Sequence, residues 1–223
     1  MAAKVGRWTG GAETENAMEQ EHAPLWQRMI DCIVEPSLSD KDVLDYGCNQ
    51  GGFLRLLWQQ KPFRKGMGVD IAAESVANAE SRKPDDALSY RTLDVLDDCE
   101  AAFDVAFSHE VLYLLPDLAA HAKTMRCVLR PGGSYYAAIG CHTDNPFWEN
   151  WKKLIAAYSA VPVQTYAPED YLRAFDDQGF SVSVRPFMLQ DFIPVKPDNA
   201  YMPRVVDSIH YHTQYKLLFR FAV

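Results

Sequence analysis

The feature that most constrains the fold is a regular alternation of short apolar runs with amphipathic segments. The run DVLDYG at residues 42–47 has the character of a buried strand, and helical spacing follows it in GFLRLLWQQK. The same pair recurs in GMGVDI and AAESVANAESRK, and further strand-like runs follow in LSYRTLDV, FDVAFSHE and SYYAAIGC. Strands that alternate with helices form right-handed βαβ units. The sequence therefore predicts an α/β fold, with a mostly parallel, doubly wound sheet covered on both faces.

Length and composition predict one domain. The chain has 223 residues, of which 48% are hydrophobic, so it can bury one sizeable core. We expect a single domain over residues 1–223, with an N-terminal cap segment at 1–40, a core at 41–189, a lid-like insert at 190–214 and a last strand at 215–223. The insert carries three prolines and is long for a plain connection, which is typical of functional lids.

The net charge and the cysteines limit the classes of partner and ligand that the chain is expected to bind. The net charge of -8 offers no basic footprint for nucleic acid or for an anionic membrane surface. Neither a membrane span nor an apolar signal core is apparent, so we expect a cytoplasmic protein. The five cysteines contain no C-x-x-C pair, which predicts neither a disulfide framework nor a metal site.

The stretch DVLDYGCNQGGF places an acid inside a strand and then glycines in the turn that follows. Asp45 is unusual because acids are depleted in strands, and Gly47 and Gly51 permit a tight turn with close backbone approach to a ligand. The helix that starts near Gly52 offers its free N–H groups at the same place. By itself such a turn is also compatible with any tight strand-to-helix connection.

Two more acids follow at the expected ends of the next strands. Asp70 ends the second strand, about 20 residues beyond the glycines, where a carboxylate can accept both hydroxyls of a ribose. Asp94 ends the third expected strand, where it can meet the edge of a purine. Each acid alone is compatible with a solvated loop or a helix cap. Three at successive strand ends favour a nucleoside-like ligand.

These motifs, in this order, resemble the class I S-adenosylmethionine-dependent methyltransferases, a Rossmann-like family of small-molecule methylating enzymes. The resemblance covers about residues 41–187 and depends on VLDYGCNQGG, GVDIAAESV, LDVLD, FDVAFSHEVLYLLPD and LRPGGSYYAAIG. It implies a Rossmann-like sheet whose last strand, YKLLFRFAV, inserts antiparallel, and it implies S-adenosylmethionine as the cofactor of a methyltransferase.

The resemblance also implies roles for individual residues. Gly47 and Gly51 border the methionine part of the cofactor, Asp70 takes the ribose hydroxyls, and Asp94 accepts from the adenine amino group. The full set of implied cofactor-binding residues is Asp45, Gly47, Cys48, Asn49, Gly51, Asp70, Ile71, Asp94, Val95, Ser108 and His109. Asn49 departs from the family, which has glycine there, although asparagine tolerates a left-handed backbone.

Dinucleotide dehydrogenases are the nearest competing family, because they share the sheet, the turn and the ribose acid. Their turn requires G-x-G-x-x-G, whereas the glycines here stand at 47, 51 and 52. This spacing disfavours a pyrophosphate site.

Methyl transfer from a sulfonium is an in-line displacement that needs positioning and exclusion of water. A base would help a phenol or a ring nitrogen, and His109 and His142 are the candidates, although both are also compatible with packing roles. Aromatic residues outside the predicted sheet favour a pocket for a flat molecule, although Trp148 has spacing that is also typical of core; the candidates are Trp8, Trp26, Trp148, Tyr201 and Tyr211.

The sequence thus favours methyl transfer to an O or N atom of a small aromatic or heterocyclic metabolite. The alternative is a non-catalytic protein that binds S-adenosylmethionine or a nucleotide to regulate or brace a partner. Asn49 keeps that alternative open.

Overall fold

The computed structural model describes residues 6–8, 11–189 and 192–223. Residues 1–5 and 9–10 of the expected cap segment, and 190–191 of the expected insert, lie outside the described residues. The helices are α1 (Ala12–Asp31), α2 (Gly52–Gln60), α3 (Ala73–Ser81), α4 (Leu118–Val128), α5 (Trp148–Ala156), α6 (Pro168–Asp176) and α7 (Val205–His210). The strands are β1 (Asp42–Tyr46), β2 (Lys65–Asp70), β3 (Leu88–Thr92), β4 (Phe103–His109), β5 (Leu129–Ile139), β6 (Ser181–Pro186) and β7 (Leu217–Ala222).

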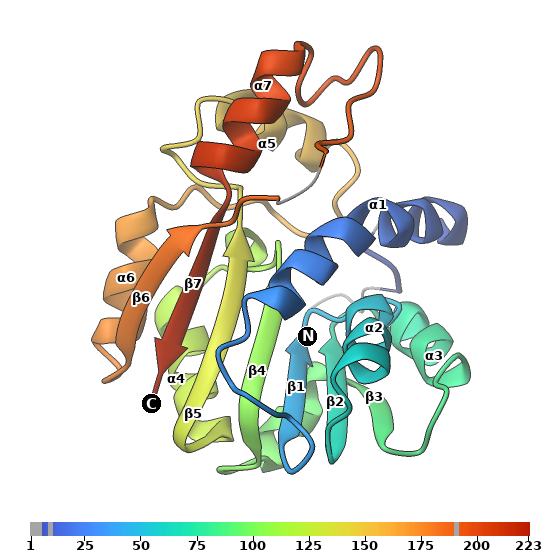
Figure 1. Ribbon diagram of the computed structural model, residues 1–223, viewed down its shortest axis with the longest axis vertical. Coiled ribbons are helices and arrows are strands. Elements are labelled where there is room, and N and C mark those ends of the chain that lie inside the picture. The colour runs from blue at the N-terminus through green and yellow to red at the C-terminus, as the bar shows by residue number, and fades with distance from the viewer. Residues whose placement is uncertain (1–5, 9–10, 190–191) are drawn as a thin grey trace.

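The strands form one seven-stranded sheet in the order β3-β2-β1-β4-β5-β7-β6 (Figure 1). Strands β1 to β5 pair in parallel, whereas β7 pairs antiparallel with both β5 and β6. The predicted α/β fold with an antiparallel last strand is therefore confirmed. The strand order reverses direction between β1 and β4, and in open α/β sheets ligands bind at such a reversal, outside the carboxyl ends of the strands.

Alternate residues of each strand supply two cores, one on each face of the sheet. Val43 contributes to the core beneath α1, α2 and α3, whereas its neighbour Leu44 contributes to the core beneath α4 and α6. Phe107 and Ala106 divide in the same way in β4. This period of two explains why the strands have nearly continuous apolar runs, since both faces are buried.

One boundary expected from the sequence was wrong. β3 ends at Thr92, and its expected last residues form a 3₁₀-helix, Leu93–Asp98. The LRPGG segment lies within β5, because α4 ends at Val128 and Leu129 already begins that strand. A register shift opposite Phe103 and Val105, with Gly132 at φ +80°, accommodates its glycines. In the N-terminal segment, α1 begins at Ala12, and polar contacts hold its first turns.

A third apolar cluster covers the carboxyl ends of the parallel strands, where α1, α5 and α7 lie (Figure 1). Its buried members come from the loops after β4 and β5, from α5 and from a π-helical turn, Tyr211–Tyr215, that follows α7. Within the described residues, no helix is long and apolar enough to span a membrane.

The α6 core contact provides a test of the packing. Phe175 is fully buried and stacks on Phe221 of β7 with ring centroids 3.7 Å apart. We expect Phe175→Ala to lower the free energy of unfolding by about 3–5 kcal/mol, through lost transfer energy and a cavity. Leu172, on the same helix but 43% exposed, is the matched control, and Leu172→Ala should cost less than about 1 kcal/mol. Urea denaturation measures both, and equal losses would contradict this packing.

Candidate functional site

The turn between β1 and α2 is built from left-handed backbone conformations. Gly47, Asn49 and Gly51 have φ of 79°, 46° and 75°. A Cβ added to Gly47 would lie 2.4 Å from a methyl group of Val111, and one on Gly51 would lie 2.4 Å from the ring of Tyr90. Both glycines are therefore required by sterics as well as by φ, and asparagine is among the few other residues that adopt this conformation readily.

Asp70, at the end of β2, fastens this turn to the neighbouring strand. Its carboxylate accepts from the backbone N–H of Asn49 at 2.8 Å and from that of Ala72 at 2.8 Å. The N–H groups of Gly47 and Cys48 donate to the carbonyl of Val69 at 2.8 and 3.0 Å. Burial raises the pKa of Asp70, and the two backbone donors oppose that rise. The predicted turn and ribose acid are thus one hydrogen-bonded unit.

Asp45 lies below the turn. The residue is 4% exposed, and its Oδ2 has no hydrogen-bond partner. Burial, and then the charge of Asp70, raises the pKa of Asp45 to about 8. Oδ1 of Asn49 is also buried without a partner. Unsatisfied buried polar atoms are uncommon in folded proteins, so these two oxygens at one strand end are candidates for contact with a polar ligand.

The other predicted cofactor residues are less closely gathered. Ile71 follows Asp70 and is 44% exposed, whereas Asp94 is exposed on the 3₁₀-helix and accepts from the hydroxyl of Thr92. Val95 is half-buried on the same helix. Ser108 faces the α4 side, where its hydroxyl lies 2.6 Å from that of Tyr135. Cys48 is buried in the turn, and burial raises the pKa of its thiol.

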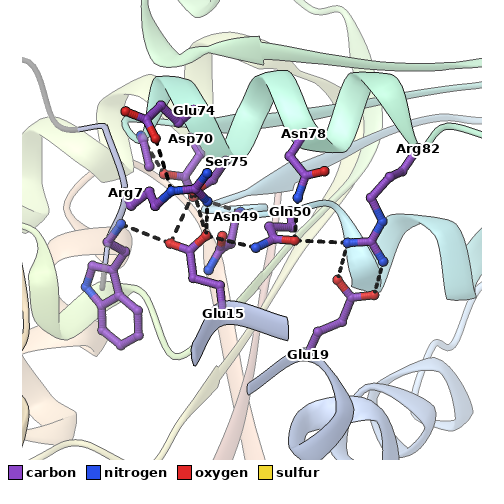
Figure 2. A network of polar contacts seen from close by, with 12 residues as sticks. Arg7, Glu15, Glu19, Asn49, Gln50, Asp70, Glu74, Ser75, Asn78 and Arg82 are labelled. Atoms are coloured by element: carbon purple, nitrogen blue, oxygen red, sulfur yellow. Dashed lines mark hydrogen bonds and ion pairs between the residues drawn. The ribbon is translucent and has the colours of Figure 1, made fainter. Parts of the chain in front are cut away.

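An N-terminal strap, defined as residues 6–8 and 11–31, crosses this site (Figure 2). Its central residue is Glu15, which is 1% exposed. The Glu15 carboxylate accepts from the Ser75 hydroxyl at 2.9 Å and from the Gln50 amide at 3.0 Å, and it pairs with Arg7 at 3.3 Å. The N–H of Trp8 also donates to it, at 3.2 Å. Glu15 therefore joins the strap to both the glycine turn and the start of α3.

The network extends outward along α3. The side-chain oxygen Oε1 of Gln50 accepts from Asn78 at 2.6 Å and from Arg82 at 3.0 Å. Arg82 also pairs with Glu19 of α1 at 2.9 Å (Figure 2). Closer to α2, Trp26 covers Gly52, where an added Cβ would lie 2.6 Å from the indole ring. The strap is thus packed tightly over the turn along its length.

His109 occupies the other side of the site, at the end of β4. Its ring lies 5.0 Å from that of His22 on the strap, and its Nε2 is buried without a partner. Burial, followed by the positive charge of Lys216, lowers the pKa of His109 well below its usual value and that of His22 to about 4. These shifts favour the neutral form of both imidazoles near pH 7, so His109 can accept a hydrogen bond.

The predicted second base, His142, makes different contacts from His109. It is 2% exposed, and its Nε2 donates to the carbonyl of Tyr215 at 2.7 Å. Of the predicted pocket aromatics, four gather in the cluster above the strand ends, whereas Trp26 packs with the core beneath α1. The four are Trp8, Trp148, Tyr201 and Tyr211.

Glu15, His22 and Lys216 are the site residues that sequence reasoning missed. Lys216 is 1% exposed and pairs with Glu110, which follows His109 directly. No spacing or motif marks these residues, because each meets the site from a segment distant in the sequence.

Residues 44–137 match the model of a methyltransferase domain. A curated relative from Synechocystis sp., 2-methyl-6-phytyl-1,4-hydroquinone methyltransferase, is 32% identical over 115 residues. That match covers 48% of this chain and 36% of the relative, so the chain spans about a third of the relative's length.

Solved structures share the fold over nearly the whole chain. A chain from the complex of the Haloferax volcanii Trm112 methyltransferase activator with a methyltransferase has a TM-score of 0.79 at 23% identity, covering 94% of this chain and 93% of that one. Geranyl diphosphate C-methyltransferase from Streptomyces coelicolor has a TM-score of 0.71 at 16% identity, covering 96% and 84%. These likenesses confirm the predicted fold class, and the match to a methyltransferase domain over residues 44–137 confirms the predicted family resemblance.

Asp45 generates a prediction about pH and stability. Its unfolded pKa is about 3.9 and its folded pKa is about 8, so the native state binds a proton that the unfolded state releases. This group therefore makes stability fall as pH rises from about 4 to about 8. We expect Asp45→Asn to be more stable relative to wild type at about pH 9 than at about pH 5, in thermal unfolding. Asp40→Asn, whose side chain is 73% exposed, is the control, and a pH-independent difference for Asp45→Asn would refute the assignment.

Glu15 generates a second prediction. Glu15→Ala removes the acceptor for the donors of Ser75 and Gln50, so we expect the free energy of unfolding to fall by about 1–3 kcal/mol. Glu13 lies in the same first turn but is exposed, and Glu13→Ala should cost less than about 1 kcal/mol. Urea denaturation compares them, and similar losses would mean that the buried network contributes nothing beyond the helix dipole.

Proposed function

We propose that this chain, which contains a class I S-adenosylmethionine-dependent methyltransferase domain, transfers a methyl group from S-adenosylmethionine to a small ring-containing metabolite. The observation that carries the proposal is the hydrogen-bonded unit of Asp70 and the left-handed turn at the sheet's reversal point. It lies where this fold binds its ligands, and the buried unpartnered oxygens of Asp45 and Asn49 lie beside it.

The residues present fit this cofactor. Gly47 and Gly51 would border its methionine part, Asp70 would take the ribose hydroxyls, and Ile71 offers an exposed apolar surface for the adenine. Asp94 and Val95 would meet the adenine edge. When bound, S-adenosylmethionine supplies a methyl group on a cationic sulfur. Burial raises the pKa of both Asp45 and Asp70, so a cation bound beside them would favour their ionised forms.

His109 is the candidate for the acceptor side. Its buried, unpartnered Nε2 can receive a proton from the acceptor or orient the acceptor by a hydrogen bond. Nε2 of His142 already donates to a carbonyl, which leaves that residue less suited to the same task. The strap and the aromatic cluster would exclude water from the reacting groups.

We infer an oxygen or a nitrogen of an aromatic or heterocyclic compound as the acceptor atom. Two relatives widen the panel of acceptors to test, since one is a hydroquinone methyltransferase and one a C-methyltransferase. The Haloferax neighbour is in complex with an activator protein, so a protein partner belongs among the proposals as well. The non-catalytic alternative is weakened by Asn49, whose backbone adopts the left-handed conformation and donates to Asp70.

Calorimetric titration with S-adenosylhomocysteine tests the cofactor. We expect binding of about micromolar affinity for wild type, and no binding of NAD. Asp70→Ala should weaken binding about 30-fold or more, because hydrogen bonds to a charged group contribute about 1.5–3 kcal/mol. Asp86→Ala, at a fully exposed acid beyond α3, is the control and should bind as wild type does.

Turnover is tested separately with S-adenosylmethionine labelled on the methyl group, offered with phenols, hydroquinones and N-heterocycles. Label transfer to any of them supports the enzyme. Cofactor binding without transfer to the whole panel would favour the non-catalytic alternative, and a preference for NAD would overturn the proposal.

A further inference from the structure

Lys216 is a buried cation at the carboxyl end of the sheet. It lies between the π-helical turn and β7, and it is 1% exposed. Its Nζ pairs with Oε1 of Glu110 and lies 3.2 Å from the hydroxyl of Tyr211. The same ammonium lies 5.9 Å from the ring centre of Phe187. Lysine is almost never buried unless it is paired, so this ammonium is held by its contact with Glu110.

Glu110 has a strained backbone that its side chain stabilises. Its φ is +56°, in the left-handed region that residues other than glycine seldom occupy. Its carboxylate accepts from the N–H of Gly140 at 3.1 Å and from Tyr211 at 3.3 Å. Lys216 lowers the pKa of Glu110 despite its burial. Such conformations persist where surrounding contacts hold them, and they concentrate at functional sites.

His109 precedes this strained residue directly. The path of the chain at Glu110 therefore sets where the imidazole of His109 lies, against His22 and with Nε2 unpartnered. The charged and titratable groups that act on this imidazole are Lys216 and His22. His22 in turn is acted on by Lys216, Glu110 and Glu21, and Tyr211 contacts Glu110. Among them Lys216 is the cation, and its charge disfavours protonation of both histidines.

We propose that Lys216 is a positioning residue of the methyl-transfer site. Through its ion pair with Glu110, it holds the left-handed backbone conformation of Glu110, which presents a neutral His109 to the acceptor. The inference rests on the proposed function and adds a residue that no motif assigns. A protonated imidazole would repel the cationic methyl donor, whereas the neutral form can accept a hydrogen bond from the acceptor. Lys216 favours the neutral form of His109 by its charge and holds His109 in place through Glu110, without itself touching the reacting atoms.

Two variants test this role. Lys216→Met removes the cation and leaves Glu110 without its partner, so the turn should loosen. Because an unpaired buried carboxylate destabilises a fold, the second variant is Lys216→Met with Glu110→Gln, which removes both charges and keeps an amide oxygen for Gly140. Lys196→Met is the control, because this lysine also pairs with a glutamate, Glu21 on the strap, but its side chain is 65% exposed.

The primary measurement is an NMR titration of the histidine side chains in the whole protein. In wild type we expect His109 to stay neutral to well below pH 6. In Lys216→Met its signals should split or broaden, and in both variants the pKa of His109 should rise by about half a unit or more. Lys196→Met should leave His109 unchanged. Unaltered His109 signals in folded variants would overturn the inference, and so would unfolding of both variants, because Lys216 would then serve the fold alone.

S-adenosylhomocysteine titration of the same samples separates this inference from the proposed function. We expect both variants to bind it within about threefold of wild type, because Lys216 touches none of the cofactor residues. Absence of binding to wild type would contradict the proposed function, whatever the histidines show. Normal binding with an unperturbed His109 would contradict the role of Lys216 alone.

Discussion

The carboxylate of Asp70 makes the hydrogen bonds on which the candidate site depends. By accepting from Asn49 and Ala72 at 2.8 Å each, it holds the glycine turn against the end of β2 and shapes the start of α3. The turn contains three left-handed residues, which an unsupported loop would not maintain in one arrangement. The glycine turn after β1 and the start of α3 after β2 therefore share one acceptor, and the sheet's reversal point lies on the other side of β1, between β1 and β4.

The first turns of the strap complete the site from the other side with polar contacts. Glu15 has lost nearly all of its solvent, and it is stabilised because hydroxyl, amide, backbone and guanidinium donors surround it. The first turns of α1 therefore depend on the turn and α3 for their placement. In return, the strap covers the glycine turn with Trp26 and brings His22 to His109.

Charge is distributed unevenly across the site. Acids concentrate near the turn, where burial raises the pKa of both Asp45 and Asp70. On the acceptor side, Lys216 and Glu110 compensate each other, and the nearby histidines are neutral. A cationic donor bound on one side would favour the ionised forms of these acids, and an uncharged imidazole is available on the other side.

The sequence by itself determined the order of strands and helices, the glycine turn and the position of Asp70, because periodicity and turn chemistry report local backbone geometry. The sequence placed Asp94 at the end of the third strand, whereas this residue lies on the 3₁₀-helix that follows β3, since strand ends depend on pairing with neighbours. Tertiary structure alone decided that Glu15, His22 and Lys216 meet at this site, and that four of the five predicted aromatics share one cluster. The physical reason is that contacts between polar groups far apart in the chain have no sequence period, so only the packed sheet and its cover bring them together.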